Sequence, residues 1–564
     1  MLAACRRDGG ADPAPVATPA PATPAPAATP APAEDDVDEE VPPVLWLGEP
    51  NLAILPGNVT ESGIQLPLVD EPVTITAMAQ VHQLRTGPFL EIEFVEWIQE
   101  ITNIRLEGYF IPVAQWNDAR NLALASGNVP EVFLNGLSIT CVMTFGPQGV
   151  LIPLNDLIAE HAPNLTALYA DRPIFKRESI APDGMQYAIR GLNELPFSNS
   201  PINMYINKTW LDNLGLAIPE TIDELYYALV AFATRDPNNN NYATEVIPFS
   251  GFKLGSPRGG NSSFYHMFGA WGFPITPGRW FYVDDNRQVQ SALLNPRFQE
   301  AVAWFAHLYQ TGLMDQEFFT QDQGMMWARA RDGDYPVVGL YLDWWGAAVG
   351  DDRRDEHYVV LPPLEGPHGH RTWHQIGAGG TALMSAITHR AEDPELIMRF
   401  FNFCLEPMIS LQLNRGPFGS VLFPTDDGRF DVVTPPEGMS IDELIFNTTA
   451  GGSFPFGLTR DLIARINLPA IQLQKINEWY PANAQFFPRY FIPAGVPFTA
   501  EEMEEMAQLN MDIADYAAAA VPQMIVGQRC VVNDWDALID SAQRMGIQRM
   551  IEIYQIAFDR FWAD

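Results

Sequence analysis

Apolar residues along the chain follow two spacings, one typical of strands and one typical of amphipathic helices. Short apolar runs predict strands at 73–78 and 132–134. Apolar positions three or four residues apart predict helices at 94–101, 116–125, 225–232 and 301–309. Thr221 and Glu224 have the spacing of a capping box at the start of the third helix. Strands that alternate with helices in this order predict an α/β architecture.

The first 45 residues differ in composition from the rest. Residues 11–33 contain only Ala, Pro, Thr, Val and a single Asp, a composition that favours an extended, semi-rigid stalk. Before it, the sequence Met1-Leu-Ala-Ala-Cys5 matches the end of a bacterial lipobox. We expect Cys5 to carry a lipid anchor after removal of a signal peptide whose charged and hydrophobic parts are not in this sequence. The region 1–45 is therefore predicted to be a lipoprotein N-terminus and linker.

Composition and missing motifs exclude several functional classes. The 564 residues hold 33 Lys plus Arg against 69 Asp plus Glu, a formal charge of −36 that disfavours nucleic acid and anionic membrane surfaces as partners. The chain contains no run of 18 apolar residues, the length that a membrane-spanning helix requires. A Walker A loop is absent because the chain has no Gly-Lys dipeptide, and no GxSxG, HExxH or GxGxxG motif occurs.

The segment 236–247 is rich in oxygen-bearing side chains at regular spacing. Positions 1, 3, 5, 9 and 10 are occupied by Asp236, Asn238, Asn240, Thr244 and Glu245, and the carbonyl of Tyr242 stands at position 7. Ca²⁺ takes six to eight oxygens from a curved loop of this kind, as in an EF-hand. The segment has no Gly at position 6 and no Glu at position 12, and its two formal negative charges predict modest affinity. The alternative interpretation is an Asn-rich turn.

The flanks of this loop and four further segments carry a family resemblance. The loop is preceded by MYINKTWLDNLGLAIPETIDEL and followed by Ile247-Pro248. Further motifs are WNDARNLALASGNVPEV at 116–132, LYQTGLMD at 308–315, LPPLEGPHG at 361–369 and the ending at 534–561. In this order they resemble the extracellular solute-binding lipoproteins of carbohydrate ABC importers, in particular the branch that binds alginate and aldouronate oligosaccharides. Glu131 stands where that family usually has Asp.

The resemblance implies an α/β, two-lobed fold like that of periplasmic binding proteins, with hinge strands near 203–207 and 358–361. Lobe one would comprise 70–200 and 357–435, and lobe two 201–356 and 436–564. The implied function is capture of a carbohydrate, an oligosaccharide, by hinge closure and its delivery to permease subunits. The protein would then be a lipid-anchored monomer on the outer face of the membrane, with structural Ca²⁺ and no enzymatic activity.

Aromatic residues are the main candidates for sugar contacts, since their rings stack on the apolar faces of sugars. The chain has 14 Trp, most of which are expected in the core. Those in Gly/Pro-rich loops or beside the second hinge strand are candidate platforms: Trp271, Trp280, Trp344, Trp345 and Trp373. Candidate polar partners are Asn207, Arg258, Asp343 and Arg371, and either arginine would suit a uronate carboxylate.

Three alternatives stay open at this stage. A secreted glycan-active hydrolase or lyase would use a similar aromatic cleft, and 69 acidic residues leave a catalytic carboxylate pair open. A receptor for a non-sugar solute would have the same fold. His368, His370 and His374 form a rival metal cluster suited to Zn²⁺, against the simpler interpretation of an exposed loop.

Overall fold

The computed structural model describes residues 54–55, 57–195, 200, 202–243, 245–252, 264–275, 280–343, 346–375, 380–436, 439, 441–468, 470–492 and 496–563. Residues 48–564 form one compact unit, separate from residues 1–47. The predicted lipoprotein N-terminus with Cys5 and the whole of the predicted linker lie outside the described residues.

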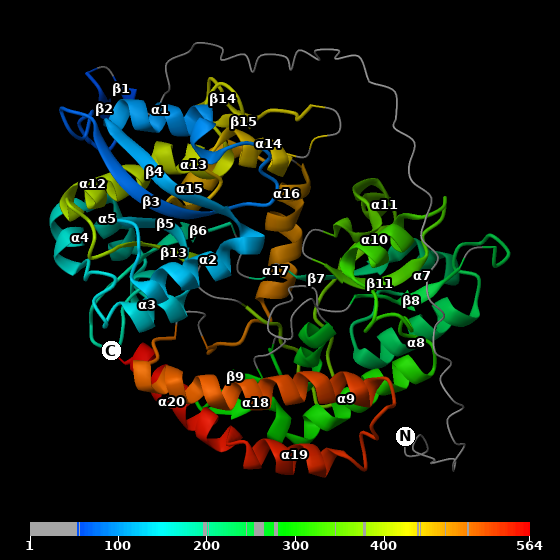
Figure 1. The fold of residues 1–564 in the computed structure, drawn as a ribbon. Helices are drawn as coiled ribbons and strands as arrows, with labels where there is room; N and C mark the ends of the chain where they lie inside the picture. Colours follow the sequence, from blue (N-terminus) through cyan, green and yellow to red (C-terminus); the bar gives the residue numbers. More distant parts are fainter. Residues whose placement is uncertain are drawn as a thin grey trace, which may run out of the picture. The chain divides into compact units, whose positions relative to one another are not determined.

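The larger sheet of the described part is six-stranded and mixed (Figure 1). Its order is β16 (Gly457–Leu458), β6 (Ile189–Asn193), β13 (Gly380–Ile387), β5 (Val132–Leu137), β3 (Val73–Val81) and β4 (Ile104–Pro112). The predicted strands at 73–78 and 132–134 are thus confirmed as β3 and β5. Every residue of β5 is buried, as expected for a central strand covered on both faces.

A second sheet contains the two strands predicted to lie at the hinge. Its order is β12 (Tyr358–Leu361), β7 (Asn203–Asn207), β11 (Val338–Asp343) and β8 (Ile247–Phe249). β7 runs antiparallel to both neighbours, with Tyr358 opposite Asn207 and Asp343 opposite Asn203. β12 therefore belongs to this sheet, and β16 belongs to the larger one. The lobe boundaries given above stay a prediction.

Helices surround both sheets, and the helices predicted from apolar spacing are confirmed. Those that pack around the six-stranded sheet and its loops are α1 (Glu93–Thr102), α2 (Val113–Ser126), α3 (Ile139–Phe145), α4 (Asn155–His161), α5 (Pro163–Asp171), α6 (Pro173–Arg177), α12 (Pro394–Cys404), α13 (Pro407–Arg415), α14 (Ile441–Thr448) and α15 (Arg460–Ala464). The remaining helices are α7 (Lys208–Leu214), α8 (Ile222–Thr234), α9 (Pro296–Gln310), α10 (Gln323–Arg331), α11 (Asp351–His357), α16 (Ala470–Gln474), α17 (Tyr480–Ala484), α18 (Ala500–Ile525), α19 (Trp535–Arg544) and α20 (Ile547–Trp562).

Short elements complete the fold. The short strands are β1 (Ile54–Leu55), β2 (Val59–Thr60), β9 (Phe281–Val283), β10 (Val289–Ser291), β14 (Leu422–Pro424), β15 (Phe430–Val432) and β17 (Ile466–Asn467). The short helices are η1 (Phe89–Glu91), η3 (Phe264–Trp271), η4 (Ala292–Leu294), η5 (Ala347–Val349) and the single π-helical turn η6 (Lys475–Trp479). The predicted capping box at the start of α8 is confirmed: the Thr221 side chain accepts the Glu224 backbone N–H, and the Glu224 side chain accepts the Thr221 backbone N–H.

Each sheet has its own hydrophobic core, which gives the two-lobed α/β fold. One cluster joins the four-stranded sheet to α8, η3, α9 and the C-terminal helices α18, α19 and α20. Another joins β3, β4 and β5 to α1, α12 and α13. In Figure 1, α16 and α17 run between the two sheets. Ile476 packs on the core of the six-stranded sheet, and Trp479 packs in a cluster on the four-stranded one.

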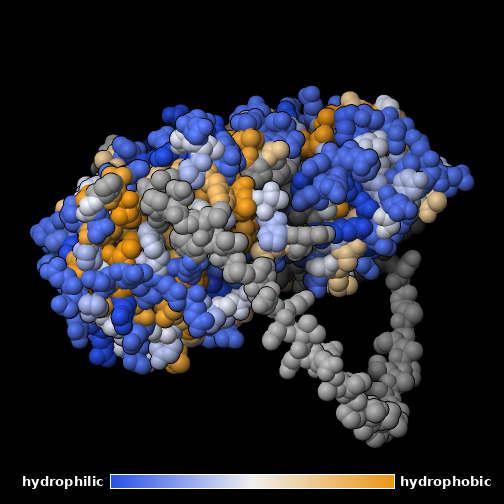
Figure 2. Space-filling view, turned by 90° about the horizontal axis from the view of Figure 1, so that it is seen from above, coloured by the Kyte–Doolittle hydropathy of each residue, from blue (hydrophilic) through white to orange (hydrophobic). Residues whose placement is uncertain are grey.

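The face of the molecule drawn in Figure 2 is mainly hydrophilic. Figure 2 shows one face on which hydrophobic residues appear in patches among hydrophilic ones. Large exposed apolar side chains come from many elements, including Tyr109 of β4, Leu122 of α2 and Ile556 of α20. None of the helices in the described ranges combines the length and apolarity needed to cross a membrane.

One glycine is essential to the pairing of β3 with β4. Gly108 has φ +137°, and a Cβ there would lie 2.0 Å from the carbonyl oxygen of Ala77. We expect Gly108→Ala to lower the free energy of unfolding by about 3 kcal/mol, since it combines backbone strain with a clash against backbone. Gly87→Ala is the matched control, because a Cβ at Gly87 meets nothing within 4 Å. Urea unfolding measures both, and equal stabilities of the two variants would contradict this account of β4.

Candidate functional site

Three chain segments converge where β7 begins. The Ser200 hydroxyl donates to the carbonyl of His374 at 3.3 Å, and the Asn483 amide donates to the Asn203 side chain at 2.8 Å in a buried position. Trp373 donates its backbone N–H to Phe486 at 2.9 Å. The segment with Ser200 connects β6 to β7, and the segment with His374 connects β12 to β13. Each of them therefore runs from one sheet to the other. This end of β7 is therefore where the two lobes are joined.

Charged and aromatic side chains gather at the same end of the four-stranded sheet. Asp343 ends β11, is 3% exposed, and accepts a hydrogen bond from the Ala348 N–H at 3.1 Å. The ring of Tyr205 stacks on Tyr341 at 5.0 Å and meets the edge of Trp479 at 5.5 Å. Tyr205 and Trp479 are 1% and 7% exposed and pack in one hydrophobic cluster, and neither was singled out from the sequence.

Lys475 is a buried basic side chain in this group. Its ammonium nitrogen lies 5.3 Å from the ring centroid of Trp479. Burial, together with the charge of Arg354, lowers the pKa of Lys475 to about 6, against the opposing effect of Asp343 and other carboxylates. Near neutral pH this side chain is thus largely an uncharged amine, which both donates and accepts hydrogen bonds. The sequence signal was slight: Lys475 is one of only four lysines in the chain.

Three tryptophans predicted to stack on sugar belong instead to the core. Trp271, Trp280 and Trp373 are 2%, 1% and 1% exposed. Trp271 packs against Trp304 and Trp280 against Phe298, with ring centroids 5.8 and 5.9 Å apart. The prediction is corrected for all three. Gly/Pro-rich loops need not lie at the surface, and here η3 and its neighbours carry their rings into the core beside α9.

Two predicted polar contacts also have structural roles. Asn207 is fully buried, and its side chain accepts the Trp210 N–H as the N-cap of α7. It lies at the opposite end of β7 from Asp343. The Arg371 guanidinium donates to the carbonyl of Pro363 and lies 4.3 Å from the ring centroid of Phe486. These contacts give both side chains structural roles, and their assignment as sugar ligands stays a prediction. Trp344, Trp345 and Arg258 lie outside the described residues.

The loop between α8 and β8 has the curvature that a cation site needs. Asn239, Asn241 and Tyr242 adopt left-handed backbone, with φ of 51°, 59° and 57°. The Asp236 carboxylate accepts backbone N–H bonds from Asn240 at 3.3 Å and Asn241 at 2.6 Å. The Asn240 amide oxygen accepts a further N–H at 3.2 Å. The oxygens of this loop are thus held by a tight turn.

The donor set fits Ca²⁺ in part. Asp236 and Asn240 supply oxygens of the kind that a hard cation prefers, but these oxygens already accept backbone N–H bonds and would have to share them, and the Tyr242 carbonyl belongs to the same turn. Asn238 accepts the indole N–H of Trp210 at 2.8 Å and would share its oxygen. The Glu245 carboxylate bonds to Arg329 at 2.8 Å and would have to leave it. Thr244 lies outside the described residues.

The histidine cluster is not a zinc site in the described structure. His368 bonds to Glu300 at 2.6 Å, His370 contacts the Arg297 guanidinium, and His374 contacts the carbonyl of Pro274 at 3.1 Å. Burial and then the charge of Arg297 lower the pKa of His370. No group of three or more His, Cys, Asp or Glu side chains suited to a metal occurs in the part of the chain that the structure describes.

Curated relatives of known role match the sequence, whereas no family model matches it. The chain is 28% identical over 536 residues to the fructooligosaccharide ABC transporter substrate-binding protein FusA of Streptococcus pneumoniae, covering 92% of this chain and 95% of FusA. Lipoprotein LipO and the polygalacturonan/rhamnogalacturonan-binding protein YtcQ, both of Bacillus subtilis, are each 26% identical. This chain spans 54% of LipO and 59% of YtcQ.

Solved structures agree with these relatives. FusA in complex with kestose has a TM-score of 0.74 at 25% identity, covering 87% of this chain and 100% of FusA. An EF-hand mutant of FusA gives 0.73 at the same identity and coverage. Two others show the fold alone. An HMO-binding solute-binding protein of Bifidobacterium longum infantis has a TM-score of 0.75 at 20% identity, covering 87% of this chain and 99% of that one. Alginate-binding AlgQ2 without calcium has 0.65 at 21%, with the same coverage.

The match to FusA runs through almost the full length of both chains, and the two-lobed fold agrees with it. Over almost its full length the chain is similar to substrate-binding proteins of ABC transporters, among them the fructooligosaccharide-binding protein FusA.

Proposed function

We propose that this protein captures an oligosaccharide outside the cell, closes its two lobes around it and delivers it to the permease of an ABC importer. The observation that carries the proposal is the match to FusA, a fructooligosaccharide-binding protein, over 92% of this chain. The geometry supports it, because two lobes with separate cores are joined by segments that meet at one end of β7. Such a joint permits hinge closure around a ligand.

The proposed sugar site lies at the joined end of the four-stranded sheet. Asp343 stands there, and Trp344 and Trp345 follow it directly in sequence. A carboxylate bonds to sugar hydroxyls, while indole rings stack on C–H faces. Lys475 and Trp479 lie beside this position on the rod formed by α16, η6 and α17. Of the polar residues predicted from sequence, Asp343 is the one retained.

The rival function is a glycan-active hydrolase or lyase with the same cleft. The relatives and solved structures named above are binding proteins rather than enzymes. Incubation with oligosaccharides, followed by chromatography, separates the two: turnover would favour the enzyme, and recovery of intact sugar would favour the receptor. A receptor for a non-sugar solute would instead respond to peptides and not to sugars.

Thermal shift with a panel of mono- to tetrasaccharides tests the proposal. We expect neutral oligosaccharides to raise the melting temperature, because a ligand that binds only the folded state stabilises it. Trp345→Ala should weaken binding about tenfold in calorimetry, since a lost stacking contact costs roughly 1 kcal/mol or more. Trp97→Ala, on α1 and stacked on Phe94, is the control for loss of a tryptophan. Equal weakening by both variants, or a response to uronates and peptides alone, would contradict the proposed site or ligand.

We also propose that the loop at 236–245 binds Ca²⁺ as a structural ion. The tight turn and the oxygens of Asp236, Asn240 and Tyr242 support this. So do two relatives of this fold: an EF-hand mutant of FusA has been made, and AlgQ2 has been crystallised without its calcium ion. Bound Ca²⁺ would tie the end of α8 to the start of β8, away from the proposed sugar contacts.

Chelation should therefore destabilise the protein. We expect EDTA to lower the melting temperature and Ca²⁺ to restore it, by the linkage between binding and folding. Asp236→Asn should abolish this difference, because it removes one of the two formal charges of the loop. Asp212→Asn is the control, as it removes an exposed carboxylate paired with Lys208 on α7. An Asp236→Asn variant that still responds to EDTA would show that the ion binds elsewhere.

Cys5 is proposed to anchor the protein to the outer face of the membrane. The lipobox pattern before Cys5 and the Pro/Ala-rich stretch after it support this assignment. Expressed behind a lipoprotein signal sequence, the chain should take up labelled fatty acid and sediment with membranes. The Cys5→Ser variant should neither take up the label nor sediment with membranes, and labelling of this variant would contradict the assignment.

A further inference from the structure

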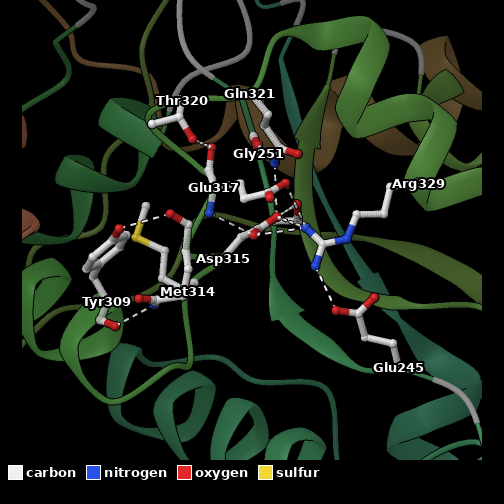
Figure 3. A network of polar contacts seen from close by, with 11 residues as sticks. Glu245, Gly251, Tyr309, Met314, Asp315, Glu317, Thr320, Gln321 and Arg329 are labelled. Atoms are coloured by element: carbon white, nitrogen blue, oxygen red, sulfur yellow. Dashed lines mark hydrogen bonds and ion pairs between the residues drawn. The ribbon is translucent and has the colours of Figure 1, made fainter. Parts of the chain in front are cut away.

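Arg329 on α10 links the proposed calcium loop to the protein body (Figure 3). Its guanidinium bonds to the Glu245 carboxylate at 2.8 Å. On the other side it bonds to both oxygens of Asp315, at 3.2 and 3.4 Å, and to Glu317 at 3.5 Å. One cation thus holds three carboxylates, and these neighbours raise the pKa of Arg329 despite its partial burial.

The Asp315 side of this network is rigid. Asp315 is 5% exposed and accepts hydrogen bonds from the Ser250 hydroxyl at 2.6 Å and the Gln321 amide at 2.9 Å. Gln321 also donates to the carbonyl of Gly251 at 2.6 Å. Buried acceptors with several donors are costly to move. Arg329 therefore keeps its place against Asp315 whatever Glu245 does.

The Glu245 side is free to change partner. The side chain of Glu245 is 62% exposed, against 2% for Asp315. An exposed ion pair contributes little to stability, so its loss is a small cost. When Glu245 leaves, Arg329 still has Asp315 and Glu317, and no buried charge is left unpaired.

We propose that Arg329 and Ca²⁺ compete for the Glu245 carboxylate. Without the ion, Arg329 holds Glu245 and fastens the end of the loop to α10. When the ion binds, Glu245 turns from Arg329 to complete its coordination, because one carboxylate does not serve both cations fully. Arg329 is thus a positioning residue that sets the Ca²⁺ affinity of the loop. This inference rests on the calcium proposal above.

Calorimetric titration of CaCl₂ into chelator-treated full-length protein tests the competition. Arg329→Gln should bind Ca²⁺ about threefold more tightly, the effect of removing one exposed ion pair. Glu245→Gln should bind more weakly than the original chain, because a ligand carboxylate is lost. In the Glu245→Gln background, Arg329→Gln should then have no further effect on affinity, as a double-mutant cycle requires for a direct coupling.

A second substitution on α10 serves as the control for the change in net charge. Arg331→Gln makes an equal change in net charge, and Arg331 lies instead over the ring of Trp327 at 4.8 Å and bonds to Ala348. We expect its Ca²⁺ affinity to match the original chain. Melting temperatures give a second readout: saturating Ca²⁺ should raise that of Arg329→Gln by more than it raises that of the original chain, whereas the loss of the Asp315 contact lowers stability with or without the ion.

The outcomes separate the two proposals. If the original chain binds Ca²⁺ but Arg329→Gln does not alter the affinity, or alters it equally in the Glu245→Gln background, the competition is wrong and the calcium site stands. If Glu245→Gln binds Ca²⁺ as tightly as the original chain, Glu245 is not a ligand and the competition is likewise wrong. Absence of Ca²⁺ binding in every variant would overturn both proposals.

Discussion

The joint between the two lobes is the constraint on which the rest of this structure depends. A receptor that encloses its ligand needs two bodies that keep their own folds while the angle between them changes. Here each sheet has a separate hydrophobic core. The buried hydrogen bond from Asn483 to Asn203 and the hydrogen bonds of Trp373 tie the crossing segments to the four-stranded sheet. If the lobes rotate relative to each other, the backbone must therefore change conformation outside these bonded residues.

Several buried polar side chains lie at this joint, among them Asn203, Asp343 and Asn483. Burial, together with the charge of Arg354, lowers the pKa of Lys475 to about 6, and Asp343 opposes this shift. Buried charged groups are expensive unless partners or ligands satisfy them. These side chains lie at the joined end of β7 and β11. A sugar bound there would offer its hydroxyl groups as hydrogen-bond partners in place of the water that burial has removed. The proposed function and the energetics of this cluster therefore agree.

In the loop at 236–245, charged side chains are paired within the protein. Its turn is held by hydrogen bonds within the loop, and its last carboxylate is held by Arg329. An arginine in this place does part of what a bound cation would do, which is to neutralise Glu245 and fix the loop to the body. The same network reaches Ser250 and Gly251 at the end of β8, so the loop and the strand after it share one set of polar contacts.

Periodicity and local motifs determined much of this protein from sequence alone. The alternation of strands and helices and the capping box of α8 followed from residues near one another in the chain, and the family resemblance implied the strands at β7 and β12. Which tryptophans face a ligand did not follow. Trp271, Trp280 and Trp373 stand in loops by sequence, yet distant elements bury them. Likewise, nothing in the sequence joins Glu245 to Arg329, 84 residues away. Burial and ion pairing depend on contacts between remote segments, and only the tertiary structure decides those.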